Sequence, residues 1–209
     1  MAYIKPILIL YSLLIAPLCF AQQTEKKYEN GERKAIGNMV NGLKEGKWTY
    51  YYPSGIKEGV EFYKADKLHG KLQGYDFDGL LIREENWEND ILCDSATYFF
   101  SNGNVEKAGR YTQSQYSGKW WFYYVNGTLK RTLFYKDGLP HGEWKYYNEK
   151  SVLTQSGFFK NGKESGSWTF YDNKGRAMYS GTYTNGKKTG DWYTIKKNGK
   201  KKLIDISGL

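Results

Sequence analysis

Aromatic residues and glycines recur along this chain at a fixed interval. The best-preserved motif reads Gly-x-Trp-x-Tyr-Tyr, as at residues 142–147. Seven positions spaced 24 residues apart align its copies: Gly46, Gly70, Asp94, Gly118, Gly142, Gly166 and Gly190. The second and third copies are degenerate, since Leu72 and Ala96 stand where the tryptophan is expected. A constant interval without insertions predicts an array of short structural repeats.

Two further sets of positions share this interval and predict the strands and turns of each repeat. Asn-Gly and related pairs favour tight turns with positive φ at two residues. They occur at Asn41-Gly42, Asn89-Asp90, Asp137-Gly138, Asn161-Gly162 and Asn185-Gly186. An aromatic residue or methionine precedes each turn, at Met39, Tyr63, Trp87, Tyr111, Tyr135, Phe159 and Tyr183. The sequence therefore predicts two strands and two turns per repeat, with no helix.

Side chains alternate between the two faces of a strand, so the motif assigns its residues to faces. Trp144 and Tyr146 are predicted on one face, and Lys145 and Tyr147 on the other. The first face then carries a row of tryptophans at Trp48, Trp120, Trp144, Trp168 and Trp192. We predict an all-β fold, an elongated single-sheet solenoid of about seven 24-residue β-hairpin repeats whose rings form a shared core.

The motif resembles that of the MORN-repeat proteins, and more closely that of the bacterial variant named YwqK-like antitoxin. The matching residues form Asn-Gly-x3-Gly-x-Trp-x-Tyr-Tyr, with Phe for the first tyrosine at 161–171, and Asp-Gly-Leu-Pro-His-Gly-Glu-Trp at 137–144. The resemblance covers about residues 37–202. It implies a MORN-like array that acts as an interaction or membrane-associated module and not as an enzyme. The antitoxin name would imply a partner toxin.

The beginning of the chain differs from the rest. Lys5 is followed by an almost wholly apolar run at residues 6–20, which ends at the small residue Ala21. This pattern is typical of a secretory signal peptide cleaved before Gln22, and it predicts a secreted protein or one of the periplasm or cell envelope. The alternatives are a lipoprotein modified at Cys19 and an uncleaved membrane anchor.

These predictions divide the chain into four segments. They are a signal peptide at 1–21, a polar leader or frayed first strand at 22–36, the repeat array at 37–202 and a C-terminal tail at 203–209. Cleavage leaves Cys93 as the one cysteine, so packing and not an internal disulfide must hold the array together. We expect Cys93 to be a half-buried small residue, with pairing between chains as the alternative.

Positive charge is concentrated near the C-terminus. Residues 22–130 hold 15 Lys/Arg and 15 Asp/Glu, whereas residues 131–209 hold 15 Lys/Arg and 7 Asp/Glu, a net charge of +8. Such a field attracts anionic lipid, cell-surface polysaccharide or nucleic acid, although a secreted location argues against nucleic acid. The alternative is that the lysines keep exposed strands soluble and block pairing at the sheet edge.

Groups suited to metal binding or catalysis are few. His69, Cys93 and His141 share one repeat position. Adjacent repeats lie about 10 Å apart, whereas zinc ligands lie about 2.0–2.3 Å from one ion, so these residues are not predicted to share a metal.

Two acidic pairs, at residues 76/78 and 84/85, are the remaining candidates for catalysis. We expect both pairs in turns and strand ends of the degenerate repeats, away from the opposed carboxyls that a glycosidase needs. No glycine-rich loop precedes a helix, so a phosphate-binding loop is not predicted either. The sequence therefore predicts a protein without enzyme activity, metal or cofactor.

The aromatic rows and the terminal lysines form the candidate binding surface. It comprises Trp120, Trp121, Tyr123, Trp144, Tyr147, Trp168, Tyr171, Trp192, Lys196, Lys197, Lys200, Lys201 and Lys202. Surface rings can stack on sugars or lie at a membrane interface, but the same rings are needed to hold a one-layer sheet together. Trp121 occupies a position that is polar in most repeats, so an exposed indole there would mark a binding residue.

Three functions remain open at this point. The leading hypothesis is a non-enzymatic scaffold that binds an unknown protein partner. The alternatives are binding to an anionic membrane surface or a cell-surface polysaccharide through the basic repeats, and an antitoxin-like partner of a toxin protein.

Overall fold

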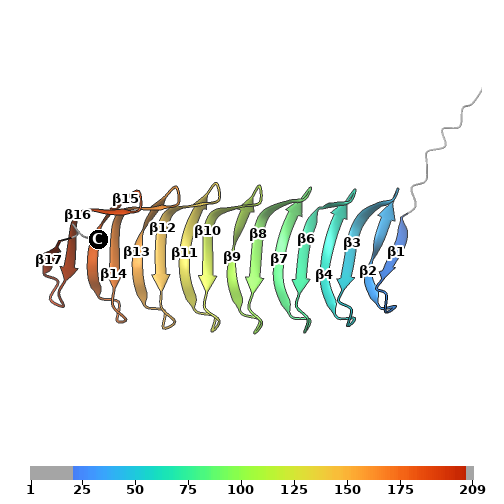
Figure 1. The fold of residues 1–209 in the computed structure, drawn as a ribbon, viewed down its shortest axis with the longest axis horizontal. Coiled ribbons are helices and arrows are strands. Elements are labelled where there is room, and N and C mark those ends of the chain that lie inside the picture. Colours follow the sequence, from blue (N-terminus) through green and yellow to red (C-terminus); the bar gives the residue numbers. More distant parts are fainter. Residues whose placement is uncertain (1–20, 206–209) are drawn as a thin grey trace, which may run out of the picture.

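The computed structural model shows one open antiparallel β-sheet, whose strands lie side by side along the long axis of the molecule (Figure 1). The structure describes residues 21–205. The predicted signal peptide lies outside the described residues except for Ala21, and the predicted tail is described only as far as Asp205. The predicted all-β class is confirmed for the described residues. No helix in this part of the chain is long and apolar enough to cross a membrane.

Seventeen strands follow one another in chain order. The first nine are β1 (Gln22–Lys27), β2 (Arg33–Val40), β3 (Leu43–Tyr51), β4 (Lys57–Lys64), β5 (Lys67–Leu68), β6 (Gly70–Tyr75), β7 (Leu81–Glu88), β8 (Ile91–Phe99) and β9 (Val105–Thr112). The others are β10 (Gln115–Tyr123), β11 (Leu129–Lys136), β12 (Leu139–Tyr147), β13 (Leu153–Lys160), β14 (Lys163–Tyr171), β15 (Ala177–Thr184), β16 (Lys187–Ile195) and β17 (Lys201–Ile204).

Each strand pairs antiparallel with its neighbours along the chain, except that β5 and β6 do not pair with each other and both pair with β4. Strands β8, β10, β12, β14 and β16 begin at residues 91, 115, 139, 163 and 187, which are 24 residues apart. The 24-residue interval of the sequence motif is therefore also the interval at which every second strand begins. Of the two alternatives for residues 22–36, the structure has a strand, β1, which pairs with β2 at one end of the sheet.

The tight turns have the backbone conformation that their Asn-Gly and Asp-Gly pairs predict. Asp137 and Gly138 have φ of 51° and 76°. In the six tight turns from residues 65–66 to residues 185–186, the second residue also donates its N–H to the preceding hairpin, as from Gly138 to Tyr116 O (3.2 Å) and from Gly162 to Pro140 O (2.8 Å). These backbone hydrogen bonds join each of the six turns to the hairpin before it.

The core of this single sheet is a row of indoles, each folded over a glycine of the preceding strand. The pairs are Gly37 with Trp48, Gly109 with Trp120, Gly157 with Trp168, and Gly181 with Trp192. A Cβ on any of these glycines would overlap the indole ring, so only glycine fits. The indole Nε1 also donates to the backbone, as from Trp120 to Arg110 O at 3.0 Å. Packing and a hydrogen bond thus fix each ring in place.

The aromatic residues that precede the tight turns lie between the tryptophans. Trp144, Phe159, Trp168, Tyr183 and Trp192 form a continuous series of edge-to-face contacts with ring centroids 5.1–5.6 Å apart. Such contacts between large rings replace the second layer that a one-sheet protein lacks. The predicted row of tryptophans with aromatic neighbours is therefore present on one face, called here the tryptophan face.

One degenerate hairpin fills its core with a carboxylate. Glu85 stands at the position of Gly109, and only 6% of it is exposed. Its carboxylate accepts hydrogen bonds from Trp87 Nε1 (3.2 Å) and from the hydroxyl of Tyr98 (2.7 Å). The expectation that Glu84 and Glu85 lie in turns or strand ends is wrong, because both lie within β7. Ala96 stands at the tryptophan position of this hairpin, and the buried Glu85 stands where four other hairpins have glycine.

Candidate functional site

Three of the tryptophans in the predicted binding surface are buried. Trp120, Trp168 and Trp192 expose 0%, 4% and 3% of their area, because each indole lies between a glycine and an aromatic ring. These three tryptophans therefore belong to the core, and their prediction as binding residues is wrong. Trp144 is half-buried, since Leu133 and not glycine faces it, and its Nε1 has no hydrogen-bond partner among the described residues.

Trp121 lies on the opposite face of the sheet and is 37% exposed. Phe134 and Phe158 lie on the same face, on β11 and β13, with 38% and 51% exposed. The ammonium of Lys119 lies over two of these rings, 5.5 Å from the centre of Trp121 and 5.8 Å from that of Phe134. We call Trp121, Phe134 and Phe158 the aromatic patch.

The tyrosines of the predicted surface also lie on this opposite face, at the ends of their strands. Tyr123, Tyr147 and Tyr171 are half-buried. The hydroxyl of Tyr171 forms a hydrogen bond with Ser156 Oγ at 3.0 Å. They flank the aromatic patch and offer part of each ring to solvent.

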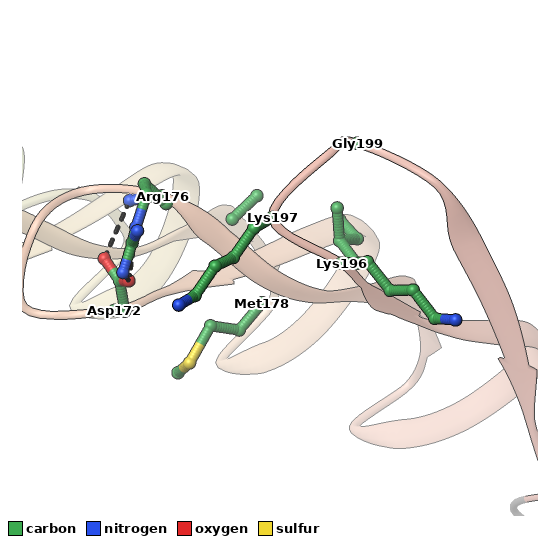
Figure 2. Close-up of a pocket in the computed structure, with 8 residues that line it drawn as sticks. Asp172, Arg176, Met178, Lys196, Lys197 and Gly199 are labelled. Atoms are coloured by element: carbon green, nitrogen blue, oxygen red, sulfur yellow. Dashed lines mark hydrogen bonds and ion pairs between the residues drawn. The ribbon is translucent and has the colours of Figure 1, made fainter.

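The five lysines of the predicted surface are exposed around the turn between β16 and β17. Two of them, Lys196 and Lys197, line a hollow of about 420 Å³ between this turn and the turn that joins β14 to β15. The complete lining is Asp172, Arg176, Ala177, Met178, Ile195, Lys196, Lys197 and Gly199, called here the C-terminal hollow. Figure 2 shows Lys197 extending toward Met178, while Lys196 extends away from the Asp172–Arg176 pair. The hollow therefore combines an apolar lining with cationic side chains.

Asp172 organises one side of this hollow. Its Oδ1 accepts the backbone N–H groups of Lys174 (2.8 Å) and Arg176 (3.0 Å), and its Oδ2 accepts Nε of Arg176 (2.8 Å). The backbone N–H of Arg176, followed by its guanidinium, lowers the pKa of the Asp172 carboxyl to about 2. Asp172 therefore stays ionised throughout the physiological range and does not act as a proton donor.

A carboxylate NMR titration of the folded protein should place the Asp172 midpoint near pH 2. Since the folded pKa is below the ordinary value, the contact stabilises the turn above about pH 4, and this contribution is lost as the pH falls through 2. Arg176→Ala removes the guanidinium but keeps the backbone N–H, so the midpoint should rise only part of the way. An Asp172 midpoint near the ordinary value in the unchanged protein would contradict the geometry.

The residues suited to metal binding are not brought together. His69 lies between β5 and β6, Cys93 lies in β8, and His141 lies in β12. Among residues 21–205, no group of three or more His, Cys, Asp or Glu side chains is placed to hold a metal ion. Cys93 is half-buried and unpaired, as expected for a small packing residue, and burial raises its thiol pKa.

Sequence reasoning missed several residues of these surfaces. Phe134 and Phe158 occupy a repeat position that holds Asn, Arg or Thr in four other hairpins and Phe62 in one, so two aromatic residues in successive hairpins were a usable signal. Arg176 and Met178 carried no such signal, because the hollow depends on how two turns 24 residues apart face each other.

Comparison with known proteins adds little. No family model and no curated protein matches the chain. Among solved structures, it is similar to the crystal structure of TcdB2-TccC3, with 14% identity, and to that of TcdB2-TccC3 without its hypervariable C-terminal region, with 13% identity. Each match covers 83% of this chain with a TM-score of 0.19, too low to support an argument. The chain spans about 13% of the length of those chains.

Proposed function

We propose that this protein is a non-enzymatic, MORN-like scaffold, a solenoid of about seven 24-residue β-hairpin repeats that is secreted or held in the cell envelope. Its function is to bind a partner protein through the aromatic patch. The observation that carries this proposal is the exposure of Trp121, Phe134 and Phe158 on one face, while the core tryptophans are buried on the other.

The chemistry of the patch suits a protein partner. Exposed Trp and Phe side chains supply large apolar contact areas, and such residues dominate the binding energy of protein interfaces. The core does not need these three rings, because the indoles and glycines of the tryptophan face provide the packing. A nearby charged pair, Lys145 with Glu143 at 2.8 Å, adds a polar rim of the kind that surrounds interface cores. An antitoxin role would be one case of such protein binding.

A second candidate function is binding to an anionic membrane surface or polysaccharide through the C-terminal strands. Residues 187–204 contain seven lysines and one aspartate, so most of this charge has no acidic residue nearby in the sequence. Binding of this kind should weaken steeply between low and physiological salt.

Site-specific photo-crosslinking tests the aromatic patch. With p-benzoylphenylalanine at position 134 of the protein in its own cells, we expect one adduct of defined mass. Position 62 is a matched control in a hairpin 72 residues earlier, since Phe62 is also 38% exposed, lies on the same face as the patch, and pairs with Lys47 as Phe134 pairs with Lys119. Trp121→Ala should reduce the adduct at position 134 about tenfold, as expected for an interface anchor. Equal labelling at both positions, or none at 134, would refute the proposal.

A further inference from the structure

Three turns at one side of the sheet contain a tyrosine that reaches the next hairpin. The hydroxyls of Tyr28, Tyr52 and Tyr124 donate to the backbone carbonyls of Tyr51, Tyr75 and Tyr147, at 2.8 Å in each case. Each acceptor lies 23 residues after its donor. The space between adjacent turns is therefore shaped to receive a phenol ring, and the protein fills it with its own side chains at these three places.

Two of these rings have a lysine at the equivalent position, six residues after the tyrosine. Lys34 lies over the ring of Tyr28, at 5.4 Å, and Lys130 lies over the ring of Tyr124, at 5.2 Å. The ring of Tyr52 is covered by Phe77, with centroids 4.3 Å apart. All three occupied spaces thus have a carbonyl at the end. Two of them have a lysine over the ring from the following strand, and the third has a cover from the next turn.

The C-terminal hollow has the same parts but no tyrosine. Asp172 stands at the tyrosine position, and Ile195, 23 residues later, supplies the equivalent carbonyl. Met178 takes the position of Lys34 and Lys130, and Lys197 takes the position of Phe77. Asp172 does not fill the space, because its carboxylate is turned to Arg176 (Figure 2).

We propose that the C-terminal hollow binds a tyrosine side chain from a partner protein, in a segment where acidic residues flank that tyrosine. The ring would lie between Met178 and Lys197, and its hydroxyl would donate to the carbonyl of Ile195. A thioether and an ammonium both interact favourably with an aromatic ring. Lys196, Lys197 and the other lysines of the β16–β17 turn favour acidic flanking residues, since this end of the chain carries the excess positive charge.

This inference rests on the proposed function only in that the ligand is a protein segment. It concerns a different site from the aromatic patch, which lies on β10, β11 and β13. The experiment uses a synthetic peptide and needs no cellular partner, so the two proposals can fail separately.

Methyl NMR of the purified protein tests the inference with the peptide acetyl-Glu-Glu-Tyr-Glu-Glu-amide. We expect a saturable shift of the Met178 ε-methyl signal and none at Met39, which lies in β2 at the other end of the sheet. The same peptide with alanine for tyrosine should bind at least tenfold more weakly. Asp172→Tyr should abolish binding by filling the hollow from within, because Tyr28, Tyr52 and Tyr124 show that a tyrosine is accommodated at this position.

Asp76→Tyr is the matched control. Asp76 occupies the same turn position and also accepts two backbone N–H groups, at 3.0 and 2.9 Å, but lies far from the hollow, so its variant should bind the peptide normally. Equal binding of the alanine peptide would show that the acidic residues alone bind the lysines, and it would overturn the inference. So would unchanged binding by Asp172→Tyr, comparable shifts at Met39, or no shift at millimolar peptide.

Discussion

Replacing Trp120 with alanine is expected to lower the free energy of unfolding by about 3–5 kcal/mol, the usual range for a fully buried tryptophan. Trp120 is fully buried, contacts the rings of Tyr111 and Tyr116, and donates its Nε1 to Arg110 O. In a sheet without a second layer, no neighbouring element can move in to fill the space. Urea unfolding followed by tryptophan fluorescence and circular dichroism measures the change.

Trp144→Ala is the comparison for this prediction. Trp144 is half-buried and its Nε1 has no hydrogen-bond partner among the described residues, so its loss should cost at least about 1 kcal/mol less. If both variants lost the same stability, the indole-over-glycine contact would not be what distinguishes the core positions.

Replacing Gly109 with alanine should cost about 2–4 kcal/mol, although it adds only one methyl group. The new Cβ would overlap the indole of Trp120, which cannot move without breaking its contacts and its hydrogen bond. Gly59→Ala is the control, since its Cβ would meet only the carbonyl oxygen of Gln73, at 3.2 Å. The same unfolding experiment should show a clearly smaller loss for the control.

A double variant separates this contact from the intrinsic effect of alanine in a strand. In the Trp120→Ala background the indole is absent, so Gly109→Ala should have little further effect. A full additive loss in the double variant would show that Gly109 is required for a reason other than Trp120.

The sequence predicted the strands and turns of this protein well, for a physical reason. Asn-Gly and Asp-Gly pairs determine local turn conformation, and alternation places Trp144 and Lys145 on opposite faces without knowledge of the remaining structure. Burial could not be predicted in the same way. It depends on the contact between Trp120 and Gly109, which lie on different strands, and only the recurrence of glycine at 37, 109, 157 and 181 hinted at it.

Prediction of the candidate sites was less complete for a related reason. Trp121 was recognisable because it replaces polar residues at one repeat position, and it is exposed. The C-terminal hollow was not recognisable, since it depends on Asp172 turning to Arg176 instead of bridging to the next hairpin as a tyrosine does. Aspartate in place of tyrosine at position 172 leaves a hollow beside the next turn, and the sequence pattern within one repeat does not show this.

The pairing of each strand with its chain neighbours affects how the protein can be made. No pairing of the described strands joins an early segment to a late one, from β1 with β2 through β16 with β17. A ribosome releases the chain from its N-terminus, and structures built on nearby contacts form quickly. Each hairpin can therefore pair with the one before it while synthesis continues, and the sheet can form before the last residue is made.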